Sequence, residues 1–142
     1  MIDRTIRITP INDESIALSG YVYDYGENPI PPPNPFFYER IPRETFEAAL
    51  RQNPNAALRF NYTGDEIANT ADGSLLLLAE DTGLHIDAIV DKRHENDLHD
   101  RIFALSFDTH GEEWTYDERN HRLITQLVLR DIGVIQKVPD QQ

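Results

Sequence analysis

The sequence predicts a β-rich α+β domain, arranged as a closed or nearly closed antiparallel β-barrel with two or three helices outside it. Three observations support this fold class. Short apolar runs, several of them with a period of two, dominate the chain, whereas few segments have the spacing of a helix. No internal repeat is present. The length of 142 residues suits a single domain spanning 1–142.

The first third of the chain reads as strands followed by a rigid loop. Strands are predicted at 6–8 and 15–25, and Gly20 inside the second one suggests a bulge or a close approach of the backbone. Residues 28–35 hold five of the nine prolines. Because proline disrupts both helices and ladders, an extended surface loop is expected there, in preference to a proline motif for a partner.

The rest of the chain alternates strands with two helices. A helix is predicted at 43–52, ending at Asn53-Pro54. The continuous apolar run at 75–78 is typical of a strand covered on both faces, within a hairpin over 74–90. Leu98 and Ile102, four residues apart, favour a surface helix at 93–103. Further strands are expected at 36–41, 58–62, 104–107, 113–116 and 122–135, with a turn at 117–120.

Composition excludes several classes of protein. The formal net charge of −12 argues against a nucleic-acid binder and against docking on an anionic membrane. Without cysteine there are no disulfides, thiolate metal sites or cysteine nucleophiles. No apolar stretch approaches the roughly 18 residues of a membrane span, and no signal peptide is visible. An acidic, intracellular protein is the expectation that remains.

Local motifs indicate neither a metal nor a cofactor. His94 and His99 are five residues apart, so they do not match the zincin helix, whose histidines are four apart. Asn61-Tyr62-Thr63 fits the glycosylation acceptor pattern by chance, because no signal peptide precedes it. The seven glycines are scattered and form no phosphate loop.

A colinear series of segments is more informative than any single motif. Together, from about Gly20 to Pro139, these segments resemble the prohead maturation proteases of tailed bacteriophages. The segments are Gly20–Tyr23, Tyr38–Pro42 with Phe46, Arg59–Tyr62, Asn69–Thr70, Gly73–Leu77, Glu80–Leu84, Ala104–Phe107, Trp114, Arg122–Ile124, Leu129–Ile135 and Pro139.

The resemblance implies a β-barrel serine protease fold related to the herpesvirus assemblins. It maps the family nucleophile onto Ser106, within Leu105-Ser106-Phe107, and the late carboxylate onto Asp131, where aspartate replaces glutamate. The family histidine, the general base, maps onto Tyr62 in Asn61-Tyr62-Thr63. The chain therefore departs from the family pattern at the position of the general base.

Tyrosine is a poor substitute for that histidine. An unperturbed phenol has a pKa of about 10, so its phenolate lies roughly 4 kcal/mol uphill at pH 7. His85 is the nearest alternative base on a strand. From the residues alone, Ser106 also fits a small side chain within a strand, and Tyr62 completes one strand face with Leu58 and Phe60.

Three functions stay open at this point. The first is a prohead-protease-like protein of a phage or prophage capsid-assembly module, impaired or inactive as an enzyme and acting as an internal scaffold or assembly factor. The second is an active serine endopeptidase that processes capsid or scaffold protein. The third is an acidic β-barrel binding module unrelated to phage assembly. The expected partners are a major capsid or scaffold protein within assembling proheads in the host cytoplasm; homo-oligomers are common in such proteases.

Overall fold

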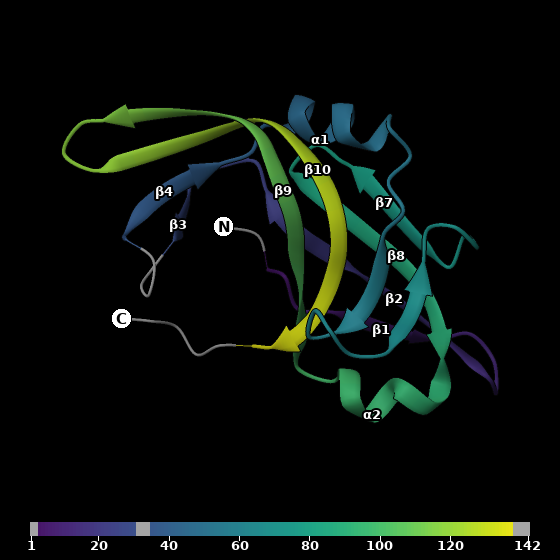
Figure 1. The fold of residues 1–142 in the computed structure, drawn as a ribbon. Coiled ribbons are helices and arrows are strands. Elements are labelled where there is room, and N and C mark those ends of the chain that lie inside the picture. Colours follow the sequence, from purple (N-terminus) through teal and green to yellow (C-terminus); the bar gives the residue numbers. More distant parts are fainter. Residues whose placement is uncertain (1–2, 31–34, 138–142) are drawn as a thin grey trace.

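The computed structural model describes residues 3–30 and 35–137 and contains two sheets packed around one core (Figure 1). The strands are β1 (Arg7–Pro10), β2 (Ser15–Asp24), β3 (Asn28–Ile30), β4 (Phe37–Arg40), β5 (Ala57–Phe60), β6 (Glu66–Asn69), β7 (Leu75–Ala79), β8 (Gly83–Asp91), β9 (Arg101–Tyr116) and β10 (Asn120–Gln136). The helices are α1 (Arg43–Leu50), a 3₁₀ turn (Lys92–His94) and α2 (Glu95–Leu98).

The first sheet is antiparallel in the order β1-β2-β8-β7. The second has the order β3-β4-β10-β5-β6, and β9 pairs along the other edge of β10. β4 and β5 both run parallel to β10, one near each of its ends. The predicted β-rich α+β class is therefore confirmed, although the sheets are not purely antiparallel.

The core lies between the two sheets because each contributes one apolar face. Ile16, Leu18 and Val22 alternate along β2 with half-exposed residues, as a strand covered on one face requires. Opposite them lie Phe103 and Ile132 of the second sheet, which are fully buried in the same cluster. Phe46 of α1 closes the core at one end, where α1 crosses beside β7 and β10 (Figure 1).

The predicted closed barrel is not confirmed, because both sheets stay open in the described ranges. On one side they are tied: Thr5 bridges to Ile102, and a Cβ at Gly20 would lie 3.3 Å from both the Phe103 ring and the Thr5 carbonyl oxygen. Gly20 thus marks the expected close approach, whereas the register shift in this strand lies later, between Tyr21 and Tyr23. On the other side, β6 and β7 end their sheets without pairing with each other.

Three local predictions are wrong. The segment 93–103 is not one helix: α2 ends at Leu98, Asp100 adopts a φ of 59°, and β9 begins at Arg101. The apolar run at 75–78 forms an edge strand, with Leu76 and Leu78 exposed. Asn28–Ile30 of the expected proline loop pairs with β4, whereas residues 31–34 lie outside the described ranges.

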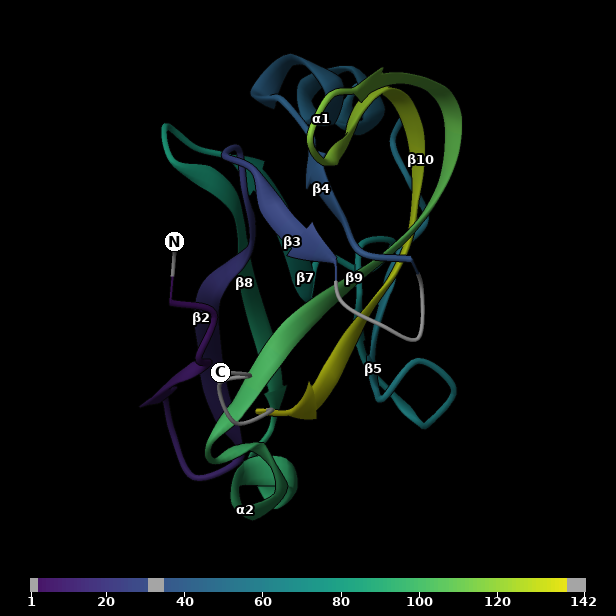
Figure 2. The ribbon, with the colours of Figure 1, turned by 90° about the vertical axis from the view of Figure 1, so that its left-hand side faces the viewer.

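The far halves of β9 and β10 form a long hairpin, the arm, that leaves the body and rests on β4 (Figures 1 and 2). Near its tip, the Arg122 guanidinium lies over the rings of Phe37 and Trp114, 5.5 and 5.8 Å from their centroids. Arg122 also donates to the buried carboxylate of Glu39 over 2.6 Å. Within the described part of the chain, no helix is long and apolar enough to cross a membrane.

Candidate active site

Ser106 lies at a bulge in the ladder between β9 and β10. Its neighbour Leu105 faces Ile132, and Phe107 faces Leu129, so Ser106 alone opposes the two residues Arg130 and Asp131. The side chain is half-buried. Because a bulge bends one strand and redirects its side chains, this position differs from an ordinary place in a ladder.

Asp131 has protein partners for both carboxylate oxygens. The Ala57 N–H donates to Oδ1 over 3.0 Å, and Arg59 Nε donates to Oδ2 over 3.3 Å. Arg59 also lies 3.6 Å from Glu66. The Asp131 carboxylate therefore anchors the start of β5 and is neutralised by a neighbouring guanidinium.

Tyr62 lies just beyond β5, in a turn rather than on the predicted strand. Asn61 adopts a φ of 51°, a left-handed conformation that asparagine tolerates, and the chain turns there. The ring then lies on Gly133: a Cβ at that glycine would be 3.1 Å from the Tyr62 ring. Burial raises the pKa of the Tyr62 phenol, and the charge of Arg4 opposes this only in part.

The three positions share the outer face of the second sheet, the face turned away from the core. Asp131 and Gly133 are two residues apart on β10, so they point to the same side. Ala104 pairs with Gly133, and Ser106 follows two residues later on β9. Figure 2 shows β5, β10 and β9 side by side. Within residues 3–30 and 35–137, however, no hydrogen bond joins Ser106 to Tyr62 or Asp131.

Comparison with known protein families shows which family the chain belongs to. The sequence model of the caudovirus prohead serine proteases matches residues 4–140. The chain belongs to this family. Searches of curated proteins and of solved structures found no match. Family membership associates the chain with maturation of phage capsids, with capsid or scaffold proteins as partners and with a serine protease fold. It argues against a binding module unrelated to phage assembly.

In this member of the prohead protease family, no histidine is positioned as a base for Ser106. All five histidines lie in the described ranges, and none forms a hydrogen bond with Ser106. His85, the alternative base suggested by the sequence, is on β8 of the other sheet, where its Nε2 lies 3.2 Å from the Ser19 hydroxyl. His85 therefore contacts Ser19 and not Ser106.

The Ser19–His85 contact is a feature that sequence reasoning missed. His85 is 8% exposed, and its Nδ1 lies 3.7 Å from Asp87 and has no hydrogen-bond partner. Tyr21 packs edge-on against the imidazole. The residues come together because β2 pairs with β8, a long-range pairing that no local motif indicates.

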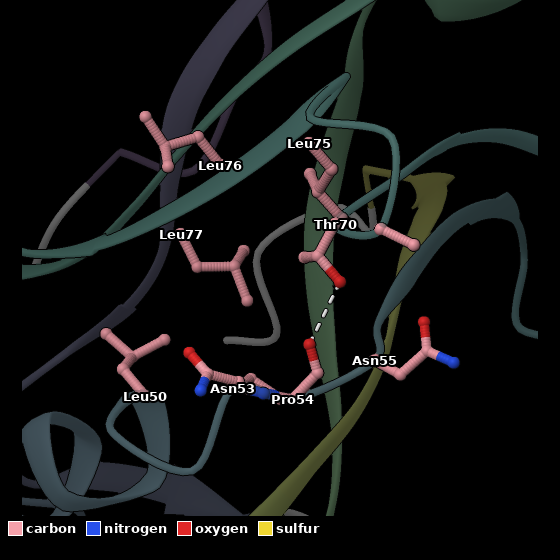
Figure 3. Close-up of a pocket in the computed structure, with 9 residues that line it drawn as sticks. Leu50, Asn53, Pro54, Asn55, Thr70, Leu75, Leu76 and Leu77 are labelled. Atoms are coloured by element: carbon pink, nitrogen blue, oxygen red, sulfur yellow. Dashed lines mark hydrogen bonds between the residues drawn. The ribbon is translucent and has the colours of Figure 1, made fainter.

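Four cavities in the described part of the protein lie away from the outer-face positions. Their volumes are about 310–460 Å³, and Ser106, Tyr62 and Asp131 line none of the four. One of them, of about 410 Å³, lies between β7 and the segment 53–55 (Figure 3). Across the described residues, no group of three or more histidine or acidic side chains is placed to hold a metal ion.

Proposed function

We propose that this chain is an internal scaffold or assembly factor of a phage or prophage capsid-assembly module, with an impaired or absent peptidase activity. It would act on a major capsid or scaffold protein within assembling proheads in the host cytoplasm. We assign the family's histidine position to Tyr62. The observation that supports the proposal is that this phenol, whose pKa is raised by burial, packs on Gly133 beside Asp131, and that no described histidine bonds to Ser106. The assemblin-like relationship of the fold is part of the same proposal.

The chemistry of acyl transfer supports this reading. A serine hydroxyl attacks a peptide carbonyl efficiently only when a neighbour accepts its proton near neutral pH. A phenol with a pKa above 10 is almost fully protonated at pH 7, so Tyr62 is not a base for Ser106. In the serine protease subtilisin, removing the histidine of the triad costs about six orders of magnitude in kcat.

The environment of Asp131 supports it too. In a triad, the carboxylate orients a histidine by accepting its second N–H. Here both oxygens of Asp131 accept from Ala57 and Arg59, and a phenol has no second N–H to offer. The carboxylate is thus better explained as an anchor between β10 and β5.

An active endopeptidase is the second candidate, because one observation favours it. Ser106 is half-buried at a bulge, and Asp131 lies across the ladder on the same face. Ser106 and Asp131 are the side chains that a serine peptidase would use beside its base, although the Asp131 carboxylate is bonded to Ala57 and Arg59 and not to Ser106.

Incubation with the capsid protein encoded beside this chain distinguishes the two candidates. We expect no cleavage by the unaltered chain, and cleavage by Tyr62→His that disappears in Tyr62→His/Ser106→Ala. Ser19→Ala is the matched control, because Ser19 already contacts a histidine. Cleavage by the unaltered chain that is lost in Ser106→Ala and kept in Ser19→Ala would overturn the proposal. An inert Tyr62→His would mean that oxyanion donors or the substrate cleft are also missing.

A further inference from the structure

A serine, a histidine and two carboxylates meet on the outer face of the first sheet, the face turned away from the core. Ser19 of β2 lies opposite Asp87 of β8, and Tyr21 lies opposite His85, so these four side chains share that face. The Ser19 hydroxyl is 3.2 Å from His85 Nε2. The Nδ1 atom of the same ring is 3.7 Å from Asp87 and 4.0 Å from Glu80. The order of groups is therefore hydroxyl, imidazole and carboxylate.

The surroundings of His85 favour one tautomer of its ring. Nδ1 is buried, lies near the two carboxylates and has no hydrogen-bond partner among the described residues. A lone pair on Nδ1 would be repelled by those negative charges, whereas an N–H at this position is attracted by them. The proton is therefore assigned to Nδ1, and Nε2 accepts the hydrogen bond from the Ser19 hydroxyl. In this tautomer a histidine acts as a base toward a serine.

The imidazole is held by its neighbours, whereas the hydroxyl is open to solvent. His85 is buried, Tyr21 packs edge-on against its ring with centroids 5.0 Å apart, and Leu78 of β7 lies opposite it. Ser19 is only half-buried, and about half of the Asp87 side chain is exposed. A fixed base beside an accessible hydroxyl is the arrangement that an activated serine requires.

A cavity of about 340 Å³ adjoins Ser19. Its lining residues are Asp3, Thr5, Arg7, Gly20 and Tyr21. Arg7 pairs with Ser19 across the β1–β2 ladder, and no hydrogen bond or ion pair engages its guanidinium within residues 3–30 and 35–137. The Thr5 hydroxyl is buried and also lacks a hydrogen-bond partner in those ranges. Unpaired polar groups that line one cavity indicate a place for a polar ligand.

The surroundings of Ser19 suit a small molecule better than a peptide. β2 pairs with β1 on one side and with β8 on the other, so it has no free edge to which an extended peptide could add. A substrate must therefore approach from the face of the sheet. Leu76 and Leu78 are exposed on this face beyond β8, and the carboxylates of Asp3 and Asp87 disfavour an anion. A neutral molecule with an apolar group fits this surface.

We propose that Ser19 is a nucleophile that small neutral carboxylic esters acylate, with His85 as its base. The Ser19 oxygen bonds to the carbonyl carbon of the ester, and the bond from that carbon to the alcohol oxygen breaks. The hydroxyl proton passes to His85 Nε2 and then to the departing alcohol. Water releases the carboxylic acid from Ser19 by the same route, and Asp87 positions the imidazole. This site goes beyond the proposed function and does not depend on the reactivity of Ser106.

A fluorophosphonate probe, which bonds covalently to activated serines, tests the site directly. Peptide mass spectrometry locates the label on the full chain. We expect labelling at Ser19 in the unaltered chain and its loss in Ser19→Ala. Ser15→Ala is the matched control, because Ser15 lies on the same strand and face but opposite Asp91. An unlabelled Ser19, with the probe absent from the chain or attached at Ser106 alone, would overturn the proposal.

Hydrolysis of p-nitrophenyl butyrate measures the reaction itself. This ester is neutral and has an apolar acyl group, and its alcohol product absorbs visible light. We expect the rate to fall about ten-fold or more in Ser19→Ala and to be unchanged in Ser15→Ala. A butyryl group should also appear on the peptide that contains Ser19. Equal hydrolysis by the unaltered chain and Ser19→Ala would contradict the assignment.

A cysteine at position 19 measures the base without any ester. The chain has no cysteine, so Ser19→Cys introduces a single thiol next to His85 Nε2. Because a neighbouring imidazole favours the thiolate, iodoacetamide should alkylate Ser19→Cys about ten-fold faster than Ser19→Cys/His85→Gln near neutral pH. Adding His85→Gln to Ser15→Cys should not change the rate, and thermal unfolding verifies that each variant is folded. Equal rates in the two variants at position 19 count against His85 as the base.

Discussion

At the scale of single residues, the contact between Gly133 and Tyr62 determines how the turn after β5 packs on the outer face of the second sheet. A side chain at position 133 would meet the Tyr62 ring and the Asn61 carbonyl oxygen, each at 3.1 Å. The turn after β5 is thereby held against β10, with a further hydrogen bond from Asn61 N to Val134 O over 2.9 Å. A glycine at 133 is what allows Tyr62 to lie beside the strand of Asp131.

Gly133→Ala should destabilise the protein by about 1–3 kcal/mol, because the added methyl group overpacks this contact. Urea unfolding measures the change. In the Tyr62→Ala background the same substitution should cost less, since the ring is gone and only the Asn61 carbonyl remains close. Equal costs in both backgrounds would mean that Tyr62 does not lie on Gly133 in solution.

The sequence indicates which positions to examine, but not how they are arranged. Ser106, Tyr62 and Asp131 come from a colinear resemblance, and their roles stay predictions. The turn at Asn61 is hidden because Leu58, Phe60 and Tyr62 continue a period-two pattern, although β5 ends at Phe60. The engagement of Asp131 by Arg59 follows from the parallel pairing of β5 with β10, which is not a local property of either segment.

At the scale of elements, Tyr25 holds the end of β2 to the turn between β7 and β8. Its hydroxyl donates to Glu80 O over 2.6 Å and lies 3.0 Å from Gly83 O. Burial raises its pKa to about 12, and the charge of Arg43 opposes the shift. The neutral phenol is therefore the form that the folded protein stabilises.

This pKa predicts a dependence of stability on alkaline pH. An unfolded tyrosine titrates at about 10, so the stabilisation is complete below pH 10 and is lost as the pH rises through 12. Tyr25→Phe should be less stable by about 1 kcal/mol at pH 8 through loss of the hydrogen bonds. Between pH 10 and 12 it should lose less stability than the unaltered chain, as measured by denaturant unfolding. A parallel decline in the two proteins would contradict the assignment.

Local patterns predict the existence of most elements but not their neighbours. β2, α1 and the β7–β8 hairpin match their predicted ranges closely because periodicity and turn residues are local. No pattern predicts β6, and β7 reads as a strand covered on both faces although it is not one. Four consecutive leucines show that the strand is apolar. Whether it lies at the edge or in the middle of a sheet depends on the strand order, which distant segments determine.

At the scale of the whole molecule, the net charge of −12 affects folding and binding in opposite directions. Self-repulsion destabilises the compact state, and added salt screens it. The same screening weakens attraction to a basic partner surface such as a capsid interior.

We therefore expect salt to raise the unfolding midpoint and to weaken binding to the purified capsid subunit. A rise from roughly 50 to 300 mM salt should reduce that affinity several-fold, because the Debye length shortens to well under 10 Å. Calorimetry and thermal unfolding on the same samples measure both effects. Capsid binding that is independent of salt would remove charge complementarity from the proposal.

The arm and the outer face are made from the same two strands, and this has a mechanical consequence. An uninterrupted ladder would transmit a displacement at the tip of the arm directly to Ser106 and Asp131. Instead the β9–β10 register shifts three times between Ile124 and Ile132. Bulges bend and twist a ribbon locally, so these shifts redirect the ribbon between the body and the arm. The last of these shifts lies opposite Ser106, so the bend of the ribbon and the placing of Ser106 and Asp131 are one and the same structural feature.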